Sequence, residues 1–207
     1  MIALEKINPP TLFTSNDKLV ISRINNLPIT GRKKWAHDDF SAIYTSAKAI
    51  LIQHQDRRCF YCQKKNPHID NDDLHIDHIV PIDEDPRFIF EEKNLVLTCK
   101  KCNKRKNNKP VLTKQTKLKY SLSPSNYSII HAHIDTYSKH IDITGDIIFS
   151  GIDKKGKRTV YDCNLDRYVL EYLTCLSSTD REFVNAALKL LLTNDPKALI
   201  TFVKAFP

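Results

Sequence analysis

The sequence predicts an α+β fold: a small metal-centred core of two strands and one helix, an N-terminal helix, and a C-terminal region of short strands and helices. Three observations predict it. Two Cys-x-x-Cys pairs enclose residues 59–102, short apolar runs with strand character lie between them, and a basic segment of helical composition follows. The chain has 207 residues, of which 41% are hydrophobic and 27% charged, enough for a globular core with substantial extensions.

Residues 1–57 form the predicted N-terminal arm and helix. Residues 1–35 predict an irregular arm with one short helix near Asn16 to Asn25. After a capping carboxylate at Asp38 or Asp39, apolar residues recur at three- and four-residue spacing as far as His54. This spacing predicts an amphipathic helix that ends near Gln55 and covers one side of the core.

Residues 58–110 form the predicted core. The alternation of residues 74–80 predicts a strand that Pro81 ends, and residues 93–98 predict a second short strand. A helix is expected from about Lys101 to Asn108, because Pro110 cannot continue it. The polar, turn-rich residues 63–73 predict a loop.

Residues 111–207 form a separate α+β region in this prediction. Gly145-Asp146 predicts a tight turn. The alternatives for its role are a partner-docking surface and a dimerising surface. Short strands are predicted at 127–134, 141–143, 147–151 and 158–161, and helices at 166–176, 179–192 and from Asp195-Pro196 onward.

The cysteine spacing predicts a structural zinc site. Zinc prefers four thiolate or imidazole ligands in a tetrahedron, and paired cysteines on tight turns supply them. A redox pair would not account for two such units. Four protein ligands leave no open position, so this ion would be structural, and Cys163 and Cys175 are expected to be buried packing residues. The predicted ligands are Cys59, Cys62, Cys99 and Cys102.

Asp77-His78 is the candidate active centre. Hydrolysis of a phosphodiester needs a base that deprotonates water and a cation that offsets charge on the phosphate. A neutral imidazole suits the first task near pH 7, and an oxygen-ligated ion such as Mg²⁺ suits the second. Neighbouring residues of a strand point to opposite faces, so one site requires the backbone to bend there. A lone strand histidine is more often structural, and the dipeptide alone leaves both interpretations open.

The motifs taken together resemble the HNH endonuclease family. In order they are Cys-x-x-Cys, Asp-His-Ile-Val-Pro, Asn-Leu-Val-Leu and Cys-x-x-Cys-Asn-x-x-Lys, over about 50 residues. The resemblance implies a ββα-metal core that hydrolyses DNA to a 5′-phosphate and a 3′-hydroxyl. It implies His78 as the general base, and Asp77 and Asn103 as ligands of a catalytic Mg²⁺ or Mn²⁺. It also implies that Asn94 orients the loop carrying the base. The alternatives are a turn former at Asn94 and a helix cap at Asn103.

The distribution of charge favours a polyanionic partner. The formal net charge is +8, and residues 100–119 contain nine basic residues and no acidic one. A solvated helix face is the alternative interpretation. The predicted phosphate contacts, which fix a duplex without reading its sequence, are Lys100, Lys101, Lys104, Arg105 and Lys106.

The run His131-Ala132-His133-Ile134-Asp135 has two interpretations. On a strand its polar residues would share one face, as metal ligands do, although a plain polar face is commoner. Together with Thr-Val-Tyr-Asp-Cys-Asn-Leu-Asp-Arg from residue 159, this run resembles the C-terminal part of small bacterial HNH proteins in anti-phage systems. The proteins in question are the Septu-type and retron-linked nucleases, which work beside an ATPase. The resemblance implies antiviral defence and an ATPase partner.

The remaining alternatives concern location and catalysis. The N-terminus has no signal-peptide core and no apolar run approaches the length of a bilayer span, so a cytoplasmic protein is expected. A rival to the nuclease is a zinc-stapled nucleic-acid-binding module without catalysis. A further alternative is a subunit that cuts only inside a complex.

Overall fold

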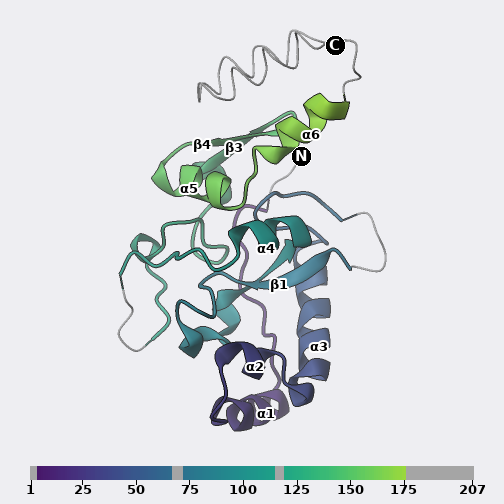
Figure 1. The fold of residues 1–207 in the computed structure, drawn as a ribbon, viewed down its shortest axis with the longest axis vertical. Coiled ribbons are helices and arrows are strands. Elements are labelled where there is room, and N and C mark those ends of the chain that lie inside the picture. The colour runs from purple at the N-terminus through teal and green to yellow at the C-terminus, as the bar shows by residue number, and fades with distance from the viewer. Residues whose placement is uncertain (1–3, 67–71, 115–118, 176–207) are drawn as a thin grey trace.

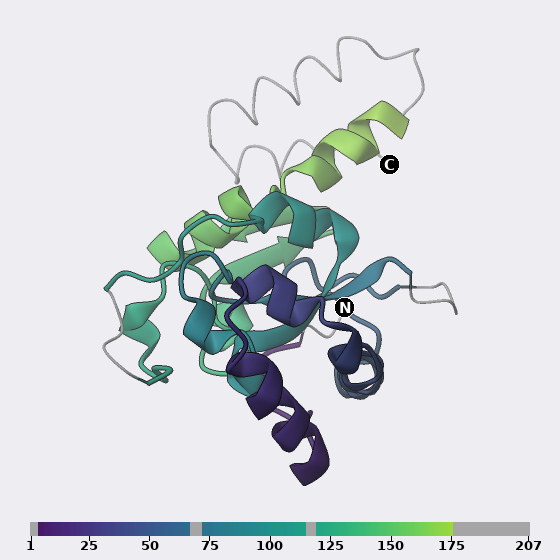
Figure 2. The same ribbon diagram turned by 60° about the horizontal axis from the view of Figure 1, so that its bottom comes forward.

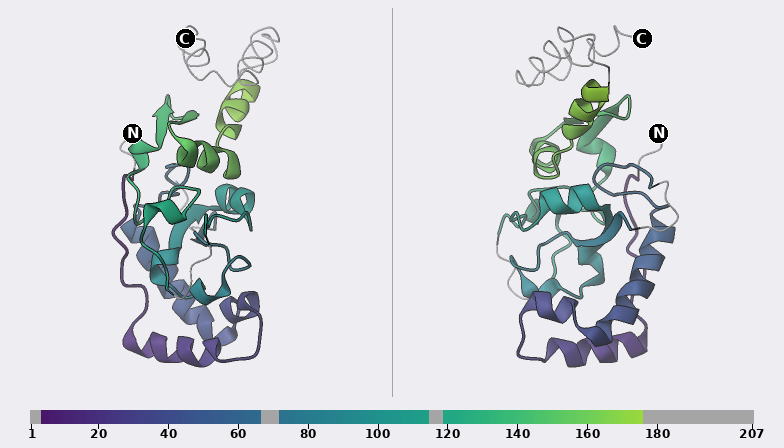
Figure 3. Two further views of the ribbon diagram at one scale, coloured as in Figure 1. Left: turned by 90° about the vertical axis from the view of Figure 1, so that its left-hand side faces the viewer. Right: turned by 45° about the vertical axis from the view of Figure 1, so that its right-hand side comes forward.

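The structure, a computed structural model, describes residues 4–66, 72–114 and 119–175 (Figure 1). Its elements stack along the long axis, with the N-terminal helices at one end, the core in the middle and the C-terminal region at the other end (Figures 1 and 3). The elements are α1 (Ser15–Asn25), α2 (Gly31–Trp35), α3 (Asp38–His54), β1 (Leu74–His78), β2 (Leu95–Cys99), α4 (Lys100–Lys106), β3 (Ile141–Thr144), β4 (Ile148–Gly151), α5 (Lys154–Asp162) and α6 (Arg167–Cys175).

The core is a hairpin followed by a helix, as the sequence predicted. β1 and β2 pair antiparallel, with Asp77 opposite Val96 and His78 opposite Leu95. β2 runs directly into α4, whose first turn is capped by Cys99, because its sulfur accepts the Cys102 amide at 3.4 Å. This ββα arrangement confirms the predicted fold class.

The hairpin separates two hydrophobic clusters. Leu74 and Ile76 lie in one cluster with residues of α1 and α3, whereas Val96 lies in the other with the cysteines and the C-terminal region. Successive side chains of a strand alternate between faces, so the two sides of the hairpin meet different parts of the chain. Asp77 and His78 therefore belong to different environments.

The N-terminal region contains one more helix than predicted. α1 begins at a capping box of Thr14 and Asp17, and α3 covers the hairpin as expected. α2, in the predicted irregular arm, is too short to show a periodic pattern. It packs closely on the core: a Cβ on Gly31 would lie 2.7 Å from the Ile82 side chain. Tertiary contact of this kind stabilises a helix that local sequence does not reveal.

The C-terminal region differs from the prediction at two places. β3 and β4 form the predicted hairpin, with Gly145 and Asp146 at positive φ in its turn, and α6 is the helix predicted over 166–176. The strand predicted at 158–161 is wrong, because these residues lie in α5, which Asp153 caps by accepting the Gly156 amide.

The strand predicted at 127–134 is also wrong. Its only ladder contact among the described residues is an isolated bridge between Leu112 and Tyr127, and a turn follows in which Asp135 accepts the His131 amide at 2.8 Å. The helices predicted at 179–192 and from Asp195 lie outside the described residues. No helix in the part of the chain that the structure describes is long and apolar enough to cross a membrane.

Candidate metal centre and active site

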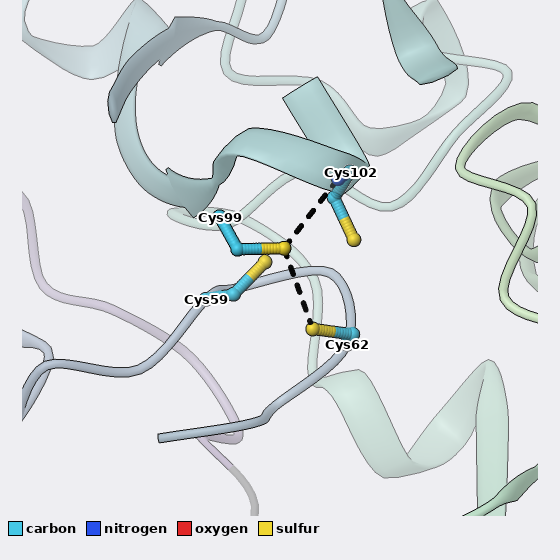
Figure 4. A group of neighbouring side chains, drawn as sticks. All are labelled: Cys59, Cys62, Cys99 and Cys102. Carbon is cyan, nitrogen blue, oxygen red and sulfur yellow. Dashed lines mark hydrogen bonds between the residues drawn. The ribbon is translucent and has the colours of Figure 1, made fainter. Parts of the chain in front are cut away.

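The four predicted cysteine ligands converge on one point (Figure 4). Their sulfur atoms all lie within 4.8 Å of one another, and the Cys62 and Cys99 sulfurs are 3.9 Å apart. A tetrahedral zinc site with bonds of about 2.3 Å places its sulfurs about 3.8 Å apart. The cluster therefore has the size and the donor type of a four-thiolate metal site. Cys59 and Cys62 come from the turns after α3, and Cys99 and Cys102 from the junction of β2 and α4.

A buried arginine from the C-terminal region lies against this cluster. The Arg167 guanidinium, at the start of α6, donates to the Cys102 sulfur at 3.1 Å and to the carbonyl oxygens of Cys163 and Asn164 at 2.8 and 2.7 Å. It also stacks on the Tyr168 ring, 4.3 Å from its centroid. A cation here offsets the charge of the thiolates, and outer partners of this kind tune a metal site. Sequence reasoning missed Arg167, because nothing local links it to Cys102, 65 residues earlier.

Asp77 points toward α4. Its carboxylate accepts the Tyr61 hydroxyl at 3.0 Å and pairs with the Lys106 ammonium at 3.2 Å. Burial raises the pKa of Asp77, and the charge of Lys106 opposes that shift. Asn103 lies three residues before Lys106 on α4 and therefore on the same side of the helix. Asp77 and Lys106 thus meet between the hairpin and α4, and Asn103 lies about one turn earlier on the same helix.

His78 lies on the other face of β1. Its Nε2 is 2.9 Å from the Ile89 carbonyl oxygen, and its ring meets Trp35 of α2 edge to face at 4.4 Å. A carbonyl can only accept, so Nε2 carries the proton and Nδ1 keeps its lone pair. Burial lowers the pKa of His78 to about 4, so the ring is neutral near pH 7. The strand pairing stays regular through His78, and the structure does not bring its imidazole and the Asp77 carboxylate to one face.

Asn94 joins the two segments that flank the His78 ring. Its amide donates to the carbonyl oxygens of Val80 and Phe88, both at 3.1 Å, and its oxygen accepts the Val80 amide at 2.7 Å and the Tyr120 hydroxyl at 3.1 Å. Val80 follows His78 by two residues, and Phe88 precedes the carbonyl that contacts the ring. These four hydrogen bonds exceed what a simple turn former needs.

The basic residues divide into an exposed set and a buried one. Lys101 is exposed and pairs with Glu171 of α6 at 2.9 Å. Lys106 is fully buried beside Asp77, so its ammonium does not lie on the surface where phosphate contact was predicted. The sequence does not distinguish Lys106 from the exposed basic residues around it on this short helix, so its burial could not be predicted. The exposed members of the predicted set are Lys100, Lys101, Lys104 and Arg105.

The side chains of His131, His133 and Asp135 all have structural partners, and the Asp135 carboxylate pairs with the Lys155 ammonium at 2.9 Å. His131 contacts the Tyr120 hydroxyl at 2.7 Å, and His133 bridges the carbonyl oxygens of Ile7 and Leu95 at 2.9 and 3.1 Å. The four-cysteine cluster is the only group of three or more potential metal ligands found among the described residues. The structure therefore favours a structural role for this run over a second metal site.

Comparison with known proteins finds a family match for the central segment of the chain. Residues 59–109 match the HNH endonuclease family. The match contains both cysteine pairs and confirms the resemblance predicted from the motifs. The Septu protein PtuB of Bacillus thuringiensis is 26% identical over 163 residues, which are 77% of this chain and 52% of that protein. The chain thus spans about half the length of this relative, and the match supports the predicted resemblance to Septu proteins. No solved structure matches the chain.

Proposed function

We propose that the protein is a metal-dependent HNH endonuclease that hydrolyses DNA phosphodiester bonds in bacterial anti-phage defence or restriction, alongside an ATPase partner. The observation that carries this proposal is the HNH match of residues 59–109 on a ββα core. The Septu relative supports the defence context. The resemblance of residues 131–135 and 159–167 to Septu-type and retron-linked proteins supports the ATPase partner. We expect a cytoplasmic protein.

Two metal sites with different duties are part of the proposal. Cys59, Cys62, Cys99 and Cys102 would hold a structural zinc, as their burial and spacing support. Asp77 and Asn103 would hold Mg²⁺ or Mn²⁺, since a carboxylate and an amide oxygen are suitable ligands. When bound, this ion would offset charge on the phosphate and on the leaving oxygen.

His78 would be the general base. Its neutral ring keeps a lone pair on Nδ1, which would take the proton from the attacking water, and its Nε2 contact with Ile89 fixes the ring orientation. Asn94 would hold the segments around the ring. Because Asp77 and His78 face opposite sides of β1, catalysis requires the chain to bend between them. The products would carry a 5′-phosphate and a 3′-hydroxyl.

The exposed basic residues of α4 would contact DNA phosphates. Such contacts bind a duplex independently of its sequence and weaken as the salt concentration rises. The proposed contacts are Lys100, Lys101, Lys104 and Arg105.

A plasmid assay tests the proposal. The wild type should nick or linearise supercoiled plasmid with added Mg²⁺ or Mn²⁺, and His78→Ala should abolish cleavage without loss of zinc. His54, an exposed imidazole at the end of α3, supplies the matched control His54→Ala, which should cut at the wild-type rate. A His78→Ala protein that cuts as well as the parent would refute the assignment.

A second candidate function is a zinc-stapled nucleic-acid-binding module without catalysis. The observation that favours it is the closed Asp77–Lys106 pair, which already neutralises the predicted metal-binding carboxylate. Binding of Mn²⁺, followed by electron paramagnetic resonance in the wild type and in Asp77→Asn, separates the two. Manganese bound through Asp77 supports the nuclease, including one that cuts only inside a complex. DNA binding without any such manganese site supports the module.

A further inference from the structure

An open groove lies between the end of α4 and the end of α5. Its volume is about 760 Å³, and it is lined by residues of the HNH segment and by residues of the C-terminal region outside the family match. Figure 2 shows α4 beside the two C-terminal helices. The hydrogen bond from Arg167 to the Cys102 sulfur links α6 to α4, and two further contacts join these parts of the chain. Lys101 pairs with Glu171 at 2.9 Å, and Lys109 donates to the Asp162 carbonyl at 2.7 Å.

The groove is predominantly cationic. Lys104 and Arg105 are exposed on its wall, and Lys109 is half-buried beside them. Asp166 is the one carboxylate among the described residues that line it. Lys109 also lies 3.6 Å from the buried Asp162 carboxylate, so Lys104 and Arg105 supply the net positive charge of the groove. A concave site of this charge attracts a polyanion.

An exposed aromatic ring completes the groove. Tyr161 is 73% exposed, more than any other large hydrophobic side chain in the described part of the chain. Its neighbour on α5, Val160, is buried, so the helix presents the tyrosine to solvent by its amphipathic pattern. The Lys109 ammonium lies 5.5 Å from the ring centroid. The Tyr161 ring thus lies beside the Lys109 ammonium, and most of the tyrosine is exposed to solvent.

We propose that this groove binds a single-stranded stretch of nucleic acid. Lys104, Arg105 and Lys109 contact successive phosphates, and an unpaired base stacks on Tyr161. Single strands are favoured because the faces of paired bases are already covered by their neighbours, whereas an unpaired base offers its face to an aromatic side chain. The inference deepens the proposed nuclease function and rests on it for the choice of nucleic acid over a protein partner.

Binding of a fluorescent oligothymidine of about 12 nucleotides, followed by anisotropy without added divalent ion, tests the stacking. Tyr161→Ala should bind about 5- to 150-fold more weakly than the wild type, the range expected for loss of one stacked base. Tyr161→Phe keeps the ring and should bind like the wild type. Tyr172→Ala, which removes a partly exposed tyrosine of α6 outside the groove, is the matched control and should also bind like the wild type.

Salt dependence tests the phosphate contacts separately. Lys104→Ala should reduce the slope of log affinity against log salt concentration by about 0.7, the value for one phosphate contact with a single strand. Tyr161→Ala should leave that slope unchanged, because stacking releases no counterions. A Tyr161→Ala protein with wild-type affinity, or a Tyr161→Phe protein as weak as Tyr161→Ala, would overturn the proposal.

The same proteins separate failure of the groove from failure of the nuclease. If the wild type cleaves plasmid and Tyr161→Ala binds oligothymidine as tightly as the wild type, the groove proposal is refuted and the nuclease proposal stands. Tight oligothymidine binding that depends on Tyr161, without cleavage and without manganese bound through Asp77, would refute the nuclease and support the groove. A Tyr161 variant that loses affinity only for a protein partner would overturn the proposal in favour of a protein-docking surface.

Discussion

Asn94 shows how one buried amide can fix the surroundings of a side chain that it does not touch, the His78 imidazole. Its four hydrogen bonds join Val80, Phe88 and Tyr120. Val80 lies two residues after His78, and Phe88 precedes Ile89, whose carbonyl contacts the His78 ring. Asn94 is 1% exposed, so water cannot replace a lost partner. The orientation of the imidazole therefore depends on the complete amide.

Asn94→Ala should destabilise the protein by about 3 kcal/mol or more, because it leaves several buried polar groups without partners. Urea unfolding measures this change in the free energy of unfolding. Asn94→Asp is the matched control: it preserves the shape and the acceptor but removes both donated hydrogen bonds, so it should lose part of that stability. Equal stability of Asn94→Ala and the wild type would contradict the role described for the amide.

At the residue scale, the sequence predicted the cysteine cluster but not the partners of the other candidate residues. The four cysteines converge as their spacing predicted. The pairing of Asp77 with Lys106 could not be predicted, because burial of one lysine within a basic helix depends on how α4 packs on β1. The contact between Arg167 and Cys102 likewise joins distant parts of the chain. Local patterns contain no information about such pairs.

At the scale of elements, the start of α6 connects the metal centre with the C-terminal region. Arg167 is 6% exposed and reaches a cysteine of α4, while its other contacts fix the turn before α6. We therefore expect that binding of a metal by the cysteines and packing of α6 against the core depend on each other.

Arg167→Met should weaken metal retention by about 10- to 100-fold, the range typical for loss of an outer partner of a metal ligand. Transfer of the metal to a chromogenic chelator measures this. Arg158→Met removes a half-exposed arginine of α5 and should release metal like the wild type. Far-ultraviolet circular dichroism checks that both variants fold. Identical release from Arg167→Met and Arg158→Met would exclude the coupling.

Elements were predicted well where length or capping made the pattern distinct. α3 shows a sustained helical period, and β3 and β4 flank a turn of the expected type. α5 was predicted in part as a strand, because Thr159, Val160 and Tyr161 have strand propensity, whereas Asp153 and the packing of Gly156 on the His140 carbonyl impose a helix. In such short segments tertiary contacts override local propensity.

At the scale of the whole molecule, the thiol cluster is part of the main hydrophobic core. Cys59, Cys62 and Cys102 lie in the same cluster as residues of the C-terminal region. Buried sulfurs that lose their shared ion leave repelling or unpaired groups in this core.

Removal of the metal by a strong chelator should therefore lower Tm by about 10 °C or more. Differential scanning calorimetry measures the shift. Cys62→Ser, which lacks one ligand, should begin at a low Tm and respond little to the chelator. Cys163→Ala, which removes a buried cysteine outside the cluster, should respond like the wild type. A wild-type Tm that does not change after metal removal would show that the cluster has no structural role.

Buried histidines should make the whole fold sensitive to acid. Burial lowers the pKa of His78 to about 4, and burial is also the main cause of the lowered pKa of His131. In the unfolded chain these groups take up protons near pH 6.5, whereas in the folded protein they stay neutral. Below about pH 6.5 the unfolded state therefore binds more protons, and the free energy of unfolding falls as the pH falls.

Each such histidine contributes a slope of up to about 1.4 kcal/mol per pH unit between about pH 6.5 and its folded pKa. Urea unfolding of the wild type and of His131→Asn over this interval isolates one of them. His131→Asn loses the hydrogen bond to Tyr120, so its stability is lower at every pH, but its slope should be shallower by about one proton. His54→Asn, at an exposed position, should keep the wild-type slope. Protonation of the thiolates adds to the slope of all three proteins, so the difference between variants is the decisive measurement. An unchanged slope in His131→Asn would mean that His131 is protonated in the folded protein as readily as in the unfolded chain.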